Sequence, residues 1–215
     1  MRLLMGLVFA SLAAVGPDLL AIGDAPLGSG LPAGWQGRAV RGFQLPDVSV
    51  VERDGERALL VEGAGRAGWL HREIRGRTVD NAVLRWSWRV DEALASGDLA
   101  RPSADDSPLR VYVIFGNPRS IFGGSGRIIF YSFGNDEPDG FETTSHVSNR
   151  IHVIRVAGAR DRSTWMSHSV RPADDYQRIW GRRPPRITAV GLMQDTDQTG
   201  ERAAALIRAL VLTNE

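Results

Sequence analysis

The sequence lacks two reactive side chains altogether, cysteine and lysine. None of its 215 residues is a cysteine, which excludes thiolate nucleophiles, thiolate zinc sites and disulfide bonds. All 26 residues in the Lys and Arg class are arginines. A chain without lysine cannot form a Schiff base and cannot supply the lysine of a phosphate-binding loop. The absence of cysteine is compatible with the bacterial periplasm, where an unpaired thiol would be oxidised.

A strong charge of one sign and a long apolar run are missing as well. The formal net charge is +1, so composition gives no reason to expect nucleic acid or an anionic membrane as a partner. Residues 3–15 are apolar but too few to span a bilayer. Because they follow Met1-Arg2 and precede small residues, we expect a signal peptide and leading segment over residues 1–25 and a periplasmic or secreted protein. A buried N-terminal helix or a retained anchor is the alternative. We expect no transmembrane helix in the mature chain.

The rest of the chain is organised as one domain. Residues 26–39 are rich in glycine and proline and are expected to lead into a single domain over residues 40–215. Short apolar segments separated by turn formers predict strands at 47–52, 57–63, 67–74, 82–90, 109–116, 127–133, 150–157, 164–171 and 186–194. Strands without intervening helices predict an all-β fold, an antiparallel β-sandwich of jelly-roll type. Segments 91–97 and 173–180 fit a short helix or a turn, and 202–212 fits a helix or a closing strand.

Two predicted strands have a clear period of two. Trp86 and Trp88 alternate with polar residues, so we expect both rings in the core, on one face of a central strand. Residues 110–115 alternate in the same way, with Arg110 and Tyr112 on the face opposite the valines.

No complete catalytic motif is present: the nucleophile elbow, the zinc-binding helix and the phosphate loop are all missing. Near the C-terminus, an apolar strand gives way to a loop with Asp195, Asp197, Thr199 and Glu201. Closely spaced carboxylates and a hydroxyl resemble the start of a calcium loop, so Asp195 and Asp197 are candidate metal ligands. The EF-hand pattern fails, because its twelfth position is Leu206. A direct ligand contact through this loop, or carboxylates that only cap turns, are the alternatives.

A second acidic segment precedes the strand that contains Arg110 and Tyr112. Its residues, Asp105 and Asp106, adjoin an apolar strand, as the loop at 195–201 does. Because buried carboxylates need partners, we expect the two segments to meet and to form one ligand-binding site. Its candidate residues are Asp105, Asp106, Arg110, Tyr112, Asp195, Asp197 and Thr199. Neighbours on a strand point to opposite faces, so at most one of the two aspartates could join a given cluster.

Arginines on the polar strand faces would recognise carboxylates or phosphates if they shared one sheet face, and are otherwise ordinary solvated residues. They are Arg85, Arg89, Arg110, Arg127 and Arg150. Trp165 and Trp180, near strand or loop ends, are better candidates for stacking on a sugar than Trp86 and Trp88.

Several blocks occur in a fixed order along the chain. They are residues 84–90, Asp105-Asp106 leading into 110–115, Trp165, Asp174-Asp175-Tyr176, and 193–200. Over residues 40–212 this order resembles a bacterial family catalogued as domain of unknown function 3047. The resemblance implies an exported, β-rich protein and supplies no reaction. Such proteins tend to end in a tyrosine-containing strand with Gly-Asp, whereas residues 206–210 are Leu-Ile-Arg-Ala-Leu, so no ligand contact is carried over from that strand.

The leading hypothesis is a non-enzymatic periplasmic domain that binds a polysaccharide or another polar envelope ligand. We expect no cofactor unless Asp195 and Asp197 bind calcium. One alternative is a carbohydrate-active hydrolase or lyase that pairs Asp105 or Asp106 with the carboxylates of the later loop. A structural envelope protein is the other. Carboxylates facing each other across a groove favour the enzyme, exposed aromatics in a cleft favour binding, and a closed convex surface favours the structural role.

Overall fold

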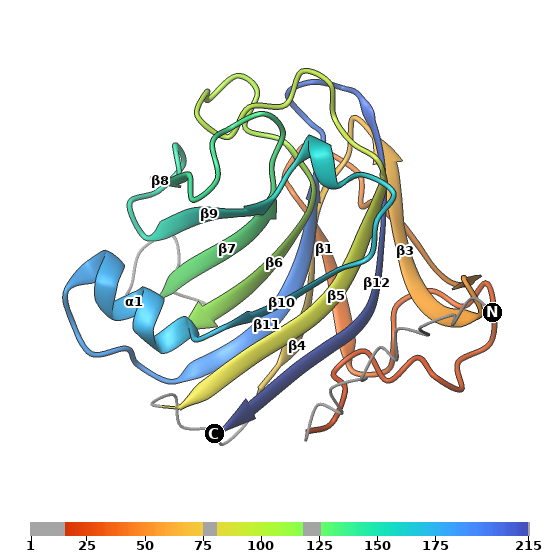
Figure 1. Ribbon diagram of the computed structural model, residues 1–215, viewed down its shortest axis with the longest axis horizontal. Helices are drawn as coiled ribbons and strands as arrows, with labels where there is room; N and C mark the ends of the chain where they lie inside the picture. Colours follow the sequence, from red (N-terminus) through yellow and green to blue (C-terminus); the bar gives the residue numbers. More distant parts are fainter. Residues whose placement is uncertain (1–15, 75–80, 118–125, 215) are drawn as a thin grey trace, which may run out of the picture.

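Alternating apolar residues pair the strands into two sheets that enclose a shared core, an all-β sandwich of jelly-roll type (Figure 1). The computed structural model describes residues 16–74, 81–117 and 126–214. The seven-stranded sheet has the order β1 (Trp35–Ala39), β4 (Ala67–Glu73), β11 (Ile187–Asp195), β6 (Ser107–Phe115), β7 (Arg127–Phe133), β9 (Ile151–Ala157) and β8 (Glu142–Thr144). The five-stranded sheet has the order β10 (Met166–Val170), β5 (Ala82–Glu92), β12 (Arg202–Asn214), β3 (Glu56–Ala64) and β2 (Asp47–Arg53). Strand pairs are antiparallel except β7 with β9, which is parallel.

All nine segments predicted as strands are strands in the structure. The ambiguous segment 202–212 belongs to β12 and pairs with both β3 and β5. Segment 173–180 is helical, as α1 (Pro172–Trp180), whereas 91–97 forms no helix. Strands β1 and β8 were not predicted.

The chain joins the sandwich before residue 40. Residues 26–39, which we expected only to lead into the domain, contain β1, and β1 pairs with β4. Further upstream, Leu20 and Ile22 are buried in the core. The apolar stretch of the expected signal peptide, residues 1–15, lies outside the described residues.

The core between the sheets confirms the prediction for the two tryptophans of β5. Trp86 and Trp88 are 2% and 0% exposed, and their ring centroids lie 5.6 Å apart in an edge-to-face arrangement. The Trp86 ring also packs on Tyr131 of β7, at 5.6 Å, so this contact joins the two sheets. His168 of β10 stacks on Trp86 at 4.9 Å, and burial lowers the pKa of this histidine to about 4.

Helix α1 closes one side of the sandwich, where the edge strands β10 and β8 end the two sheets. It follows β10 directly, and its Arg178 pairs with Glu142 of β8 at 2.6 Å. Tyr176 of the helix is buried and packs on Phe115 at 4.8 Å. Within the described part of the chain, no helix is long and apolar enough to cross a membrane.

The seven-stranded sheet also buries the face that it turns away from the other sheet, which we call the outer face. The residues that alternate with those of the inter-sheet core form a second apolar cluster. Its members are Leu99, Tyr112, Ile114, Ile128, Phe130, Ile151, Val153, Ala189 and Met193. Leu99 is the member from outside the sheet, and Phe141 packs against the cluster as well. Two loops, residues 93–106 and 134–141, therefore cover part of the outer face.

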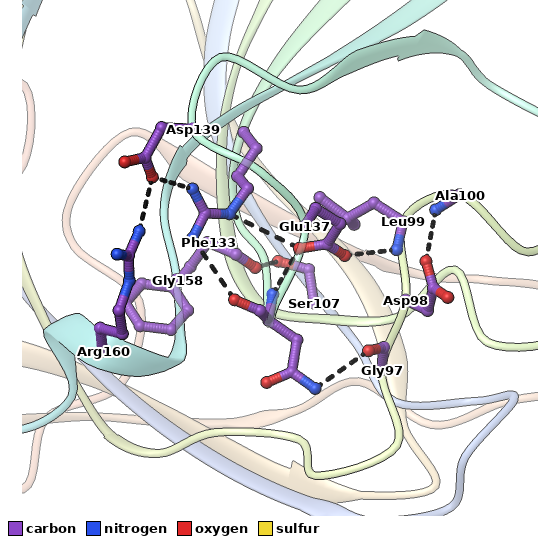
Figure 2. Close-up of polar contacts among 12 residues, drawn as sticks. Gly97, Asp98, Leu99, Ala100, Ser107, Phe133, Glu137, Asp139, Gly158 and Arg160 are labelled. Carbon is purple, nitrogen blue, oxygen red and sulfur yellow. Dashed lines mark hydrogen bonds and ion pairs between the residues drawn. The ribbon is translucent and has the colours of Figure 1, made fainter.

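Glu137 links these two loops, and it forms a buried ion pair with Arg155 of β9 (Figure 2). Glu137 accepts hydrogen bonds from the backbone N–H groups of Leu99 and Asn135, both at 2.7 Å. Its Oε2 lies 3.5 Å from Nε of Arg155, and the two side chains are 5% and 4% exposed. Gly158 is required beside the pair, because a Cβ there would collide with the Arg155 guanidinium.

Replacing Trp88 by alanine should lower the free energy of unfolding by about 3–5 kcal/mol, because the cavity lies between both sheets. Urea unfolding followed by circular dichroism measures this loss. The matched control is Trp165→Ala, which removes a partly exposed ring and should cost less. A loss below about 1 kcal/mol for Trp88→Ala would contradict the core position.

Glu137→Ala should also destabilise the protein, by about 1–3 kcal/mol, because it leaves the buried Leu99 amide without an acceptor and Arg155 with only the exposed Asp139 as its partner. It should also release the loop at 93–106, which hydrogen exchange at the Leu99 amide would report. Arg160→Ala is the control, since Arg160 pairs with the exposed side of the same network and should cost less than about 1 kcal/mol. Equal losses for the two variants would show that the buried pair has no special role.

Candidate functional site

The two acidic segments meet, as the sequence predicted. β11 ends beside the start of β6, where Asp195 pairs with Ser107. The carboxylate of Asp106 accepts backbone hydrogen bonds from Gln198 at 3.3 Å and Thr199 at 2.7 Å. Asp106 is therefore fixed against the loop between β11 and β12, residues 196–201.

Arg110 lies at the centre of this junction. Its Nη2 donates to the backbone oxygen of Asp105 at 2.8 Å and to Oδ1 of that residue at 2.9 Å. Its Nη1 lies 4.0 Å from Oδ2 of Asp195. The guanidinium carbon sits 5.2 Å from the ring centre of Phe130, so the arginine joins the acidic segments to the apolar outer face. Its Nε and the neighbouring Ser132 hydroxyl are buried without a hydrogen-bond partner among the described residues.

Three carboxylates crowd together beside Arg110. One oxygen from each of Asp106, Asp195 and Asp197 lies within 4.8 Å of the other two. Burial raises the pKa of the Asp195 carboxyl to about 7; Arg110 opposes this rise, and the neighbouring carboxylates add to it. Burial and then the charge of Asp106 raise the pKa of Asp197 as well. This group can hold a proton near neutral pH or bind a cation.

Thr199, predicted as a ligand contact, has a structural role in the loop. Its backbone N–H donates to Asp106, and its hydroxyl accepts the N–H of Glu201 at 3.3 Å. Glu201 in turn accepts bonds from the backbone N–H groups of Ala95 at 2.6 Å and Ser96 at 3.4 Å. The loop between β11 and β12 is thus tied to the covering loop at 93–106.

Tyr112 is on the predicted face, but it offers no free hydroxyl there. It is 1% exposed, and its hydroxyl donates to the backbone oxygen of Leu70 at 3.2 Å. To reach that oxygen, the ring lies across Gly191, where a Cβ would collide with it. The tyrosine therefore packs beneath the exposed surface of the outer face and supports the side chains that cover it.

The residue that Tyr112 supports is Trp69, which the sequence analysis did not single out. Its ring is partly exposed and packs edge-on against Tyr112 at 5.3 Å and beside Phe130 at 5.5 Å. Met193 of β11 separates it from the acidic junction, since Met193 pairs with Trp69 on one side and with Arg110 on the other. Two strand spacings, about 10 Å, therefore separate the backbones of Trp69 and Arg110. Trp69 precedes Leu70 in the same predicted strand, so alternation places its side chain on the face opposite the buried Leu70. This was the signal available in the sequence.

Two hollows adjoin this face. One of about 250 Å³ is lined by Gly34, Gln36, His71, Arg72 and Glu73. Trp69 does not line this hollow, but it shares a face of β4 with His71 and Glu73, which do. The second, of about 410 Å³, lies between the covering loops and is lined in part by Phe141.

The predicted arginine surface does not form on one sheet face. Arg85 and Arg89 belong to β5 in the five-stranded sheet, whereas Arg110 belongs to the other sheet. Arg127 packs over the Trp180 ring at 5.3 Å, beside α1. Alternation along a strand gives the face of each residue but does not tell which sheet the strand joins.

Trp165 and Trp180, the sequence-based candidates for sugar stacking, are engaged with protein groups. The Trp165 ring lies under the Arg208 guanidinium at 4.3 Å, and its Nε1 donates to Asp54 at 2.8 Å. Trp180 packs on Tyr176 at 4.7 Å. These contacts make Trp69 the better candidate.

Several solved structures are similar to this one at low sequence identity. A family 11 carbohydrate-binding module of a cellulosomal cellulase of Clostridium thermocellum has a TM-score of 0.49 at 7% identity, covering 94% of this chain and 97% of that one. The xyloglucanase domain of NopAA, a type three effector from Sinorhizobium fredii, has a TM-score of 0.47 at 11% identity, covering 89% and 99%. The enzymatically active domain of tailspike protein 4 of bacteriophage CBA120 has a TM-score of 0.45 at 9% identity over 85% of this chain, which spans only 20% of that one. These likenesses concern the fold alone.

Sequence comparison gives a family and no characterised relative. Among curated protein sequences, none matches this chain. A family model matches over residues 33–211, and the chain therefore belongs to the family described as protein of unknown function (DUF3047).

Proposed function

We propose that this protein is an exported, non-enzymatic domain that binds a glycan or a similar polar envelope ligand on the outer face of the seven-stranded sheet. The observation that carries the proposal is Trp69, a partly exposed ring supported from below by Tyr112 and Phe130. The faces of aromatic rings attract C–H edges, and sugar rings present rows of C–H groups on their faces. A rigid aromatic platform is therefore suited to a sugar ring.

Polar groups surround the platform on the same face. Gln36 and His71 pair across β1 and β4, and Arg38 pairs with Trp69. Side-chain amides, imidazoles and guanidiniums exchange hydrogen bonds with hydroxyl groups. Gln36 and His71 line a hollow on the same face of the sheet as Trp69, so a ligand longer than one sugar ring that stacks on Trp69 can extend to these groups.

A carbohydrate-active hydrolase is the second candidate, and one observation favours it. The pKa of Asp195, raised to about 7 by burial, is that of a group able to donate a proton near neutral pH. The burial of this carboxyl argues against it. Asp195 is 8% exposed, so a substrate has little access to it.

The proposal predicts that Trp69→Ala weakens glycan binding at least about tenfold while leaving the fold intact, because a central aromatic contributes a large share of binding energy. Affinity electrophoresis against a panel of soluble neutral and acidic polysaccharides would find the ligand, and titration calorimetry would measure the dissociation constant. Trp165→Ala is the matched control and should bind as the wild type does.

Three results would redirect the assignment. Equal weakening by both tryptophan variants would move the site away from the outer face. Release of reducing ends by the wild type, lost in Asp195→Asn, would support the hydrolase. Retention of no polysaccharide in the panel would favour the structural envelope role. Fractionation of the native host tests the exported location, which predicts the protein in the periplasm or the medium.

A further inference from the structure

The junction of β6 with the loop at 196–201 carries more negative charge than its cation can balance. Within residues 16–74, 81–117 and 126–214, Asp105, Asp106, Asp195 and Asp197 surround one guanidinium, that of Arg110. Arg110 is already committed to Asp105, at 2.9 Å, and lies 4.0 Å from Asp195. When all four carboxylates are ionised, three negative charges stay uncompensated in a largely buried place, which is costly without a further cation.

The three carboxylates are close enough to share one cation. Oxygens of Asp106, Asp195 and Asp197 lie within 4.8 Å of one another. Calcium binds oxygen at 2.3–2.6 Å, and three oxygens 4.8 Å apart would lie about 2.8 Å from a common centre, so a small contraction brings all three within reach of one ion. Magnesium requires about 2.0–2.1 Å, which would need the three oxygens to approach more closely.

An independent feature points to the same ligand. Asp195 is 8% exposed, and its Oδ1 has no hydrogen-bond partner in the described part of the chain. Oδ1 of Asp197 is buried without a partner as well. Buried carboxylate oxygens are normally paired with donors or metal ions, so an oxygen left unpaired beside two other carboxylates indicates an ion.

The third carboxylate is held in position by the backbone. Asp106 receives the N–H groups of Gln198 and Thr199. Each carboxylate oxygen can accept a second interaction, so these bonds orient Asp106 and leave it able to bind a metal.

We propose that Asp106, Asp195 and Asp197 bind one calcium ion that ties the start of β6 to the loop between β11 and β12. Water molecules complete the coordination shell, which for calcium holds six to eight oxygens. The ion balances the excess charge beside Arg110 and fixes the rim of the outer face. This site is separate from the Trp69 platform and does not depend on the glycan proposal.

Titration calorimetry tests this on the full protein after treatment with EDTA and dialysis. Calcium chloride should bind with a stoichiometry of one ion per chain. Thermal unfolding should shift upward by about 5–10 °C at a calcium concentration about a hundredfold above the dissociation constant. Magnesium chloride at the same concentration should give a smaller shift.

Asp197→Asn is the decisive variant, because Asp197 is only partly buried and its replacement keeps the size of the side chain. Losing one of three charged ligands should weaken calcium binding at least about tenfold. Asp136→Asn, an exposed carboxylate in a different loop, is the matched control and should bind calcium as the wild type does. The double variant Asp195→Asn, Asp197→Asn should melt at the same temperature with calcium and with EDTA.

The proposal is overturned by any of three results. These are no heat of binding and no thermal shift at millimolar calcium, undiminished calcium binding by Asp197→Asn, or an equal thermal shift with sodium chloride at matched ionic strength. If the double variant does not fold, the single variant and its control decide.

Discussion

The anchoring of the loop at residues 93–106 is the constraint on which the acidic junction and the cover of the outer face depend. Two carboxylates hold it. Glu137 binds the Leu99 amide from one side, and Glu201 binds the Ala95 and Ser96 amides from the other. With the loop in place, Leu99 covers the outer face, and Asp106 at its end reaches the loop between β11 and β12. Because Glu137 is itself buried, its charge must be matched by Arg155, and the backbone at Gly158 must approach that arginine without a side chain.

The outer face combines two environments that normally exclude each other. On one side of Met193, aromatic rings pack as in a core, and on the other side carboxylates crowd around Arg110. Arg110 makes this possible, because its guanidinium lies against the Phe130 ring while its nitrogens face the acidic segments. The planar guanidinium lies against the ring and also donates to the backbone and carboxylate oxygens of Asp105, a combination that the compact ammonium group of lysine does not match.

The sequence predicted the strands well where one face of a strand is polar, and less well elsewhere. Trp86 and Trp88 were placed in the core by a period of two, and the structure confirms it. In β12 nearly every residue from 203 to 213 is buried or half-buried, so alternation is lost and the segment could not be told from a helix. The three residues of β8 are too few to show any pattern. The contact between the two acidic segments was predicted correctly, because buried carboxylates need partners even when these lie far apart in the sequence.

Tyr112 and Trp69 show what alternation cannot predict. Both lie on the outer face, but which one reaches solvent depends on packing across three strands, namely the lean of Tyr112 over Gly191 toward Leu70. The Tyr112 ring can lean this way only because β6 pairs with β11 and β11 pairs with β4. Neither pair consists of strands that follow each other in the sequence. A candidate site built from sequence alone therefore included the supporting residue and missed the residue that it supports.

The separation of Trp69 from Arg110 by one intervening strand also decides how the two proposed sites relate. The backbones of Trp69 and Arg110 lie about two strand spacings apart, roughly 10 Å, yet the Trp69 ring and the Arg110 guanidinium both lie against the ring of Phe130. A ligand that extends from Trp69 across Met193 would also reach the acidic rim. An ion among the three carboxylates would therefore act on the platform mainly through packing, by fixing Arg110 beneath Phe130 and, through Phe130, the ring of Trp69.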